Sequence, residues 1–259
     1  MSNKPTSPKN TPPNNRREQL QQQREQEAKE RRIRNIITYG ILGVAVLAIV
    51  GVIAAVVLST RNAPVASGGG ATTGEYTLVA GNADAPVTVA IYQDYMCPYC
   101  GRFERANRAD LEAMVADGSA KIEFHLMNFL DDASQGTKFS SRAANALVAV
   151  AKAEPDKVMA FNAALFDGQP EENTAGLSDS QIADLARQAG VSNDVVATFA
   201  QMANQDFVNR SNTAAFQSGV TGTPTVKING ETWPAQGQGG LMYESGPLKA
   251  AVAEAAAKK

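Results

Sequence analysis

Three short stretches of the chain alternate apolar and polar residues, and each predicts a β-strand. In "APVTVAIYQDY" (residues 85–95), Val and Ile occupy every second position. In "KIEFHLMNF" (residues 121–129), Ile, Phe and Leu share one face, whereas Glu123 and His125 share the other. The third stretch is "TGTPTVKING" (residues 221–230), whose Asn-Gly end is typical of a hairpin turn.

Elsewhere the apolar residues recur at helical spacing. One helix is expected from the cysteine pair to about Ala116. The pattern is helical from about residue 134 to residue 219, with breaks near residues 168–176 and 190–193. A last helix is expected in "GPLKAAVAEAAAKK" (residues 246–259), which carries Pro in its first turn.

An uncharged apolar run covers Ile36–Leu58. A helix of this length spans roughly 35 Å, enough to cross the ~30 Å hydrocarbon core of a bilayer. A buried core helix would show polar positions at helical spacing, and this run has none. A cleavable signal has an apolar region of only about 7–15 residues, and the chain after Leu58 lacks a clean A-x-A cleavage site. We therefore predict a single uncleaved transmembrane helix.

The flanking charges predict its orientation. Arg31, Arg32 and Arg34 stand just before the span, and only Arg61 follows soon after it. Because positive flanks stay in the cytoplasm, the N-terminus is expected inside and everything after Leu58 outside. The rest of the chain would then lie in an extracytoplasmic, oxidising compartment.

Composition divides the chain further. Residues 1–35 carry nine Lys and Arg against four Glu, a net charge of +5, and predict a disordered, basic cytoplasmic arm. Residues 59–75 contain three consecutive glycines and predict a flexible linker. Residues 36–259 carry fifteen Lys and Arg against twenty-two Asp and Glu, a net charge of −7. Such an acidic body argues against a nucleic-acid partner.

Cys97 and Cys100 are the only cysteines, in the motif "CPYC". They could form a stapling disulfide, part of a metal site, or a working redox pair. A structural zinc site needs four ligands, and His125 is the only histidine, so we predict no metal. The same scarcity leaves no basis for a Cys-His hydrolase.

A staple across so short a loop would contribute only on the order of 2 kcal/mol. At positions i and i+3 of a helix the Cβ atoms lie about 5–6 Å apart, whereas a relaxed disulfide needs roughly 3.5–4.5 Å. A strained bridge is easily reduced, so the spacing favours a redox pair over a staple.

The flanking residues also favour reactivity. A strand leads into Cys97 and a helix begins there, so free N–H groups and the positive end of the helix dipole should stabilise its thiolate. Pro98 fits the first helical turn. Cys100, one turn deeper, is suited to resolving a mixed disulfide.

The motif "CPYC", preceded by an apolar strand and followed by "GRFE", resembles the active site of the DsbA-like thiol–disulfide oxidoreductases of the thioredoxin superfamily. Residues 121–129 resemble the strand after the active-site helix, and residues 131–220 stand where that family inserts a helical domain. "GTPT" resembles the cis-proline loop, so the resemblance implies that Pro224 is a cis-proline preceded by Thr223.

The resemblance implies an α/β fold over residues 76–259: a thioredoxin fold with an inserted helical domain, preceded by a single transmembrane helix. Two differences from the family's pattern bear on the redox chemistry. Tyr99 replaces the histidine of the best-known members, and Ile91 stands where thioredoxin has a buried acid. Asp94 and Glu123 are the nearest candidates for a proton acceptor serving Cys100, but each is otherwise interpreted as a loop or strand-surface carboxylate. Glu104 is interpreted in the same way, as a solvated residue of the active-site helix.

We interpret the chain as a membrane-anchored, extracytoplasmic bacterial oxidase that introduces disulfides into exported proteins. Cys97 exchanges with the client, Cys100 resolves, Pro98 and Tyr99 support the pair, and Thr223 and Pro224 line the opposite wall. The Cys97–Cys100 dithiol carries the electrons, so no other cofactor is expected, and a membrane redox partner re-oxidises it. A reductase or isomerase of the same fold, or a binding or chaperone module with an inert disulfide, remains the alternative.

Overall fold

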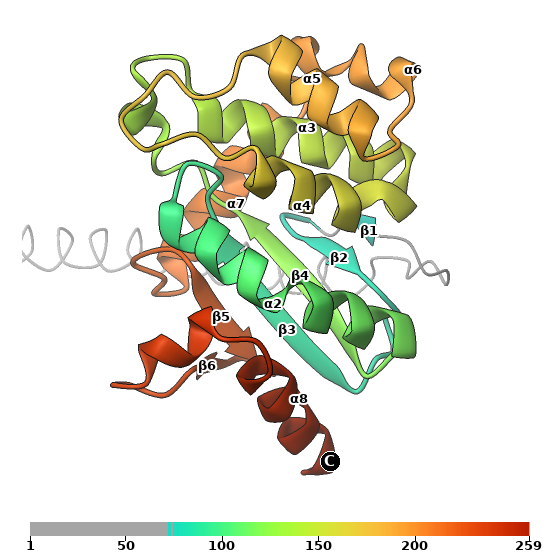
Figure 1. Ribbon diagram of the computed structural model, residues 1–259, viewed down its shortest axis with the longest axis vertical. Helices are drawn as coiled ribbons and strands as arrows, with labels where there is room; N and C mark the ends of the chain where they lie inside the picture. Colours follow the sequence, from blue (N-terminus) through green and yellow to red (C-terminus); the bar gives the residue numbers. More distant parts are fainter. Residues whose placement is uncertain (1–71, 74, 259) are drawn as a thin grey trace, which may run out of the picture. The chain divides into compact units, whose positions relative to one another are not determined.

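Two parallel strands, β3 (Val87–Gln93) and β4 (Ala120–Leu126), form the centre of the sheet. Parallel neighbours need a crossover connection, and helix α2 (Pro98–Asp117) supplies it (Figure 1). The computed structural model describes residues 72–73 and 75–258. Within that range the chain enters α2 directly from β3, as the sequence predicts.

The remaining strands extend the sheet on both sides, in the order β1-β2-β4-β3-β5-β6. All four pair antiparallel with their neighbours. They are β1 (Thr72–Thr73), β2 (Leu78–Ala80), β5 (Thr225–Ile228) and β6 (Glu231–Trp233).

Different helices cover the two faces of β3. Its alternating Val and Ile residues are buried in the main core, against α2 and the C-terminal helix α8 (Pro247–Ala257). Tyr92 faces the other side and lies in a smaller cluster with Ala215 of α7 (Gln205–Gln217). The strand is therefore buried on both faces, as is usual in a sheet with parallel strands.

Helices α3 to α6 gather at one end of the sheet in Figure 1. Twelve of the fifteen residues of α3 are buried, so α3 is the central helix of this group. Three short 3-10 segments accompany the group: η1 (Asp131–Ser134), η2 (Pro155–Lys157) and η3 (Phe199–Gln201). The helices are α3 (Phe139–Ala153), α4 (Val158–Asp167), α5 (Asp179–Gln188) and α6 (Asn193–Val196).

The predicted hairpin after the third strand is present. Asn229 (φ 49°) and Gly230 (φ 91°) turn the chain from β5 into β6 in the left-handed conformation that two-residue hairpin turns require. The Asn229 side chain also accepts a hydrogen bond from the Thr88 N–H at 3.0 Å, which fastens the turn to β3. A 3-10 segment, η4 (Gly239–Tyr243), then leads into α8.

Other predictions differ from the structure or lie outside the described residues. The strand predicted over residues 121–129 ends at Leu126, and β1 and β2 were missed because two or three residues show no period. The basic arm, the transmembrane span Ile36–Leu58 and nearly all of the linker lie outside the described residues. Within the described range, no helix has the length and apolarity needed to cross a bilayer.

Candidate active site

Cys97 is the residue immediately before α2, where the chain leaves β3. Its backbone is extended (φ −75°, ψ 115°), and Pro98 takes the first helical position, where a missing N–H costs nothing. The Cys97 carbonyl accepts hydrogen bonds from the N–H groups of Cys100 (3.0 Å) and Gly101 (3.3 Å). The Cys97 side chain therefore lies at the N-terminus of α2, the positive end of the helix dipole.

The loop before β5 contacts Cys97, although 126 residues separate the two in the chain. When Cys97 is protonated, its Sγ donates a hydrogen bond to the carbonyl oxygen of Thr223 at 3.3 Å. The Thr223–Pro224 peptide bond is cis, which confirms the prediction made from "GTPT". A second cis bond, Trp233–Pro234, was not predicted.

The two thiols have opposite electrostatic environments. The hydrogen bond with Cys100 lowers the pKa of Cys97 to about 6, against the opposing effect of burial, with further lowering by Thr223 and by the backbone N–H groups of Cys100 and Tyr99. Burial raises the pKa of Cys100 well above its ordinary value, and the interaction with Cys97 raises it further. Near neutral pH the pair therefore holds one thiolate, on Cys97, and one thiol, on Cys100.

Asp94, three residues before Cys97, is completely buried. Its carboxylate accepts hydrogen bonds from the N–H of Met96 (2.9 Å), the N–H of Leu130 (3.0 Å) and the hydroxyl of Ser140. Asp94 lies in the loop between β3 and α2, as expected, but it is not a surface carboxylate. The reason is tertiary: Ser140 belongs to α3, which covers Asp94 from 46 residues further along the chain.

The buried position of Asp94 changes its acidity. Burial raises its pKa to about 7, the hydrogen bonds from Ser140, Leu130 and Met96 oppose this rise, and the negative charge of Cys97 adds to it. None of the three hydrogen bonds to this carboxylate comes from Cys100. The geometry therefore favours Asp94 as a residue that holds the active-site loop rather than as a direct base for Cys100.

Gln169, in the loop after α4, was missed in the sequence. Its Nε2 donates hydrogen bonds to the carbonyl oxygens of Tyr95 (2.9 Å) and Cys97 (2.8 Å), on either side of the turn into α2. The Gln169 Oε1 occupies the space that a side chain at residue 101 would fill. A Cβ on Gly101 would lie only 2.1 Å from this oxygen. A glutamine in a polar loop carries no signal that would have revealed this contact.

The other acidic candidates are paired elsewhere. Glu104 is buried, and both of its carboxylate oxygens accept hydrogen bonds from Arg108 at 2.7 Å, so its interpretation as a solvated residue is wrong. Arg108 also pairs with Asp167 at the end of α4, which explains why this side of α2 is covered. Glu123 lies on the strand surface as expected, within 3.9 Å of His125.

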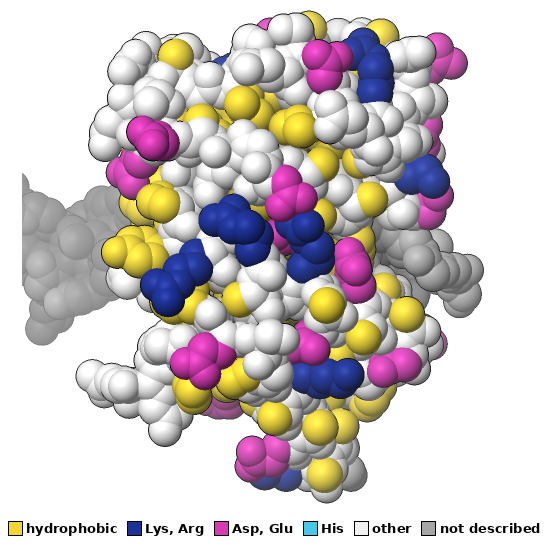
Figure 2. All heavy atoms as spheres, in the orientation of Figure 1, with side chains coloured by type: hydrophobic (Ala, Val, Ile, Leu, Met, Phe, Trp, Pro, Cys, Tyr) yellow, Lys and Arg dark blue, Asp and Glu magenta, His cyan; other side chains and the backbone are white. Residues whose placement is uncertain are grey.

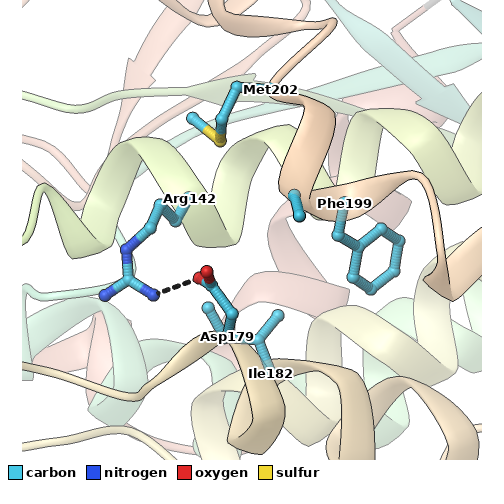
Figure 3. A pocket seen from close by; sticks show the side chains of 6 residues that line it. Arg142, Asp179, Ile182, Phe199 and Met202 are labelled. Atoms are coloured by element: carbon cyan, nitrogen blue, oxygen red, sulfur yellow. Dashed lines mark hydrogen bonds and ion pairs between the residues drawn. The ribbon is translucent and has the colours of Figure 1, made fainter.

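A small cavity of about 40 Å³ lies within the helical group and is lined by Arg142, Asp179, Ile182, Phe199, Ala200 and Met202. Figure 3 shows Arg142 and Asp179 pointing toward one another across it, joined by an ion pair of 2.7 Å. The cavity has room for a few water molecules only. Within the described residues, no group of three or more His, Cys, Asp or Glu side chains could hold a metal ion.

The family model described as thioredoxin matches residues 73–238. The crystal structure of reduced DsbA from Mycobacterium tuberculosis is 25% identical, with a TM-score of 0.52 over 72% of this chain and 100% of that one. Oxidised BdbD from Bacillus subtilis is 21% identical, with a TM-score of 0.58 over 74% of this chain and 98% of that one, and shares the fold.

Part of the chain is also similar to a segment of a much longer protein. The serine/threonine-protein kinase PknE of Mycobacterium tuberculosis is 34% identical over 154 residues, which are 56% of this chain and 27% of the kinase. The chain thus spans about a quarter of the length of this relative. The family model, by contrast, covers well over half of the chain, through the cysteine pair and the cis-proline loop. The chain therefore belongs to the thioredoxin family and has the fold of the DsbA-like thiol–disulfide oxidoreductases.

Proposed function

We propose that this protein is an extracytoplasmic thiol–disulfide oxidoreductase that introduces disulfides into exported proteins. One observation carries the proposal. Cys97, whose pKa is lowered, lies at the start of α2 and contacts the cis-proline loop, and it lies beside Cys100, whose pKa is raised. Both cysteines are buried, but Cys97 is slightly more exposed, at 5% against 1% for Cys100, and has the lower pKa. Cys97 is therefore the sulfur that attacks or is attacked, and Cys100 resolves.

The exchange takes two steps. A client thiolate attacks the Cys97 sulfur of the Cys97–Cys100 disulfide, a client–Cys97 disulfide forms, and Cys100 leaves and takes up a proton. A second client thiolate then attacks the client sulfur of that mixed disulfide and displaces Cys97 as a thiolate. Two client thiols become one disulfide, and the two electrons they lose reduce the protein's disulfide. One client proton ends on Cys100 and the other in solvent.

The stability of the reduced form determines the direction of electron transfer between the protein and its client. A stabilised Cys97 thiolate favours the reduced form of the protein, which makes the disulfide form a stronger oxidant. A low pKa also makes Cys97 a good leaving group in the second step. Both effects favour oxidation of clients over their reduction.

Other parts of the proposal rest on the sequence. The apolar span Ile36–Leu58 and its basic N-terminal flank support an anchor that leaves the catalytic part outside the cytoplasm. The backbone beside Pro224 is suited to pair with an extended client segment. Because the dithiol carries the electrons itself, a separate membrane partner would re-oxidise it.

The reduction potential tests this function directly. The full-length chain, equilibrated with glutathione buffers, should have a potential of about −120 to −200 mV, above the roughly −270 mV of thioredoxin. With oxidised glutathione supplied as the oxidant, Cys100→Ala should accumulate mixed disulfides with a reduced, unfolded protein, whereas Cys97→Ala, the matched control, should not. A potential near that of thioredoxin would instead support a reductase.

A further inference from the structure

Two tyrosines and two arginines form an edge beside the cysteines, and all but Tyr243, which is half-buried, are exposed. Tyr99, between the two cysteines in the chain, is the most exposed of the described large hydrophobic residues, at 58%. Its ring centroid lies 6.2 Å from that of Tyr243, at the end of η4. The Arg102 guanidinium lies over the other ring, 4.4 Å from the Tyr243 centroid. We call Tyr99, Arg102, Arg105 and Tyr243 the rim.

The contact with Tyr99, which lies between the two cysteines in the chain, places Tyr243 close to the dithiol. The pKa of Tyr243 is raised by burial first, and then by electrostatic interaction with Cys97 and Cys100, while Arg102 opposes the rise. Tyr243 follows Cys100 by 143 positions, so only the fold brings η4 to this edge. A polypeptide that delivers a thiol to Cys97 would therefore meet the rim within a few residues of its own cysteine.

The arginines of the rim differ from the other arginines of the described chain. The four others each form an ion pair with a carboxylate: Arg108, Arg142, Arg187 and Arg210. Within the described residues, Arg102 and Arg105 form no such pair. Arg105 donates one hydrogen bond to the Phe166 carbonyl, and the Arg102 guanidinium lies over the Tyr243 ring. Both are exposed on the first turns of α2.

This unpaired positive charge stands out against an acidic protein. Figure 2 shows several Lys and Arg side chains close together over α2, with Asp and Glu side chains beside some of them. The first turn of α2 contains no acidic residue. In the oxidised protein, where Cys97 carries no charge, no side chain of that turn therefore neutralises the positive end of the dipole. At the edge beside Cys97, an anionic side chain of a client would therefore bind more tightly than a cationic one.

We infer that the rim selects clients that carry acidic side chains within a few residues of the reacting cysteine. Arg102 and Arg105 would pair with the carboxylates, and the exposed ring of Tyr99 would contact apolar neighbours of that cysteine. Planar guanidinium groups match carboxylates in two parallel hydrogen bonds, which suits them to this role. This inference rests on the proposed function and names its substrate class.

Three synthetic peptides test it. Each has two cysteines that can join in an intramolecular disulfide, and the four flanking positions are all Glu, all Gln or all Lys. The oxidised full-length chain in detergent is mixed with each reduced peptide, and the rate constant of peptide oxidation is divided by that measured with neutral dithiodipyridine. This division removes the effect of the flanking charge on the reactivity of the peptide thiols.

At low salt the Glu peptide should react about fivefold faster than the Lys peptide, with the Gln peptide between them, and the difference should shrink in 1 M salt. Arg102→Glu should reduce the Glu-to-Lys ratio to about one or invert it. Arg187→Glu, a control with the same change in net charge on α5, should keep the ratio. Using the ratio removes any effect of Arg102 on the pKa of Cys97.

Equal rates for the three peptides, or an unchanged ratio in Arg102→Glu, would overturn the inference while leaving the proposed function intact. If no peptide is oxidised, the proposed function fails instead. Binding of the same peptides with Ser in place of Cys then decides the inference alone. Tighter binding of the Glu peptide, lost in Arg102→Glu, supports it, and equal binding of the three refutes it.

Discussion

Gln169 lies in the space that Gly101 leaves empty. A Cβ on Gly101 would come within 2.1 Å of the Gln169 Oε1, while the Nε2 of the same amide holds the Cys97 carbonyl at 2.8 Å. The loop after α4 therefore fastens the reactive turn only because residue 101 has no side chain. An alanine there would displace the flexible end of Gln169 rather than the backbone.

Double substitution should reveal this coupling. Gly101→Ala alone should lower the free energy of unfolding by about 1 kcal/mol, because displaced Gln169 loses two hydrogen bonds while the helix gains a better helix former. In a Gln169→Ala background the same Gly101→Ala change should stabilise by up to about 1 kcal/mol. Denaturant unfolding of the four proteins measures the cycle. Equal effects of Gly101→Ala in both backgrounds would show that the two residues are not coupled.

The thiolate of Cys97 should titrate near pH 6, and Cys100 should be one of the causes. Thiolate absorbance near 240 nm should appear with a midpoint of about pH 6 in the reduced protein and be missing in Cys97→Ala. In Cys100→Ala the midpoint should move upward, because the hydrogen bond with Cys100 is the largest of the effects that lower this pKa. An unchanged midpoint would assign the lowering to the helix and to Thr223.

The same shift predicts a pH-dependent stability of the reduced form. The folded pKa of Cys97, about 6, lies below the ordinary thiol value of 9.0, so the unfolded chain binds more protons between these two values. The stability of the reduced protein relative to the oxidised one should therefore rise with pH across this window, by up to about 1.4 kcal/mol per pH unit, and be lost as pH falls through 6. Unfolding curves of both forms at pH 5, 7 and 8.5 measure it. A flat difference would contradict it.

Asp94→Asn should destabilise the oxidised protein by about 1–3 kcal/mol. The amide nitrogen of Asn would replace an oxygen that now accepts a hydrogen bond, so two donors would face each other. The folded pKa of Asp94, about 7, lies above its ordinary 3.8, so its contribution is greatest below pH 4 and is lost as pH rises to 7. The stability of the wild type should therefore fall between pH 4 and 7 more steeply than that of Asp94→Asn. Ser140→Ala, which keeps the carboxylate, should cost about 1 kcal/mol and retain the slope.

The predicted anchor can be tested in cells. Protease added outside intact bacterial cells expressing the chain should remove the part after Leu58 and leave the basic arm protected, because positive flanks remain in the cytoplasm. Antibodies against each end of the chain report the result. A catalytic part that resists digestion until the cells are lysed would contradict the predicted topology.

Local sequence was sufficient for several elements. The alternation in β3, the helix that begins at Pro98 and the Asn229-Gly230 turn depend on backbone geometry within a few residues, and all three are present. Family resemblance added the cis bond at Pro224. The sequence also placed Cys97 at a helix start, from which its low pKa follows in part.

Only the tertiary structure decided what surrounds these elements. Asp94 is buried because Ser140 and α3 cover it, Gln169 meets Gly101 across a gap of 68 positions, and Tyr243 comes to the active-site edge from near the C-terminus. Periodicity reports which side of an element is apolar, but it does not report which other segment packs there. Burial, hydrogen-bond partners and unpaired charge are properties of that second segment, so no pattern local to the first can contain them.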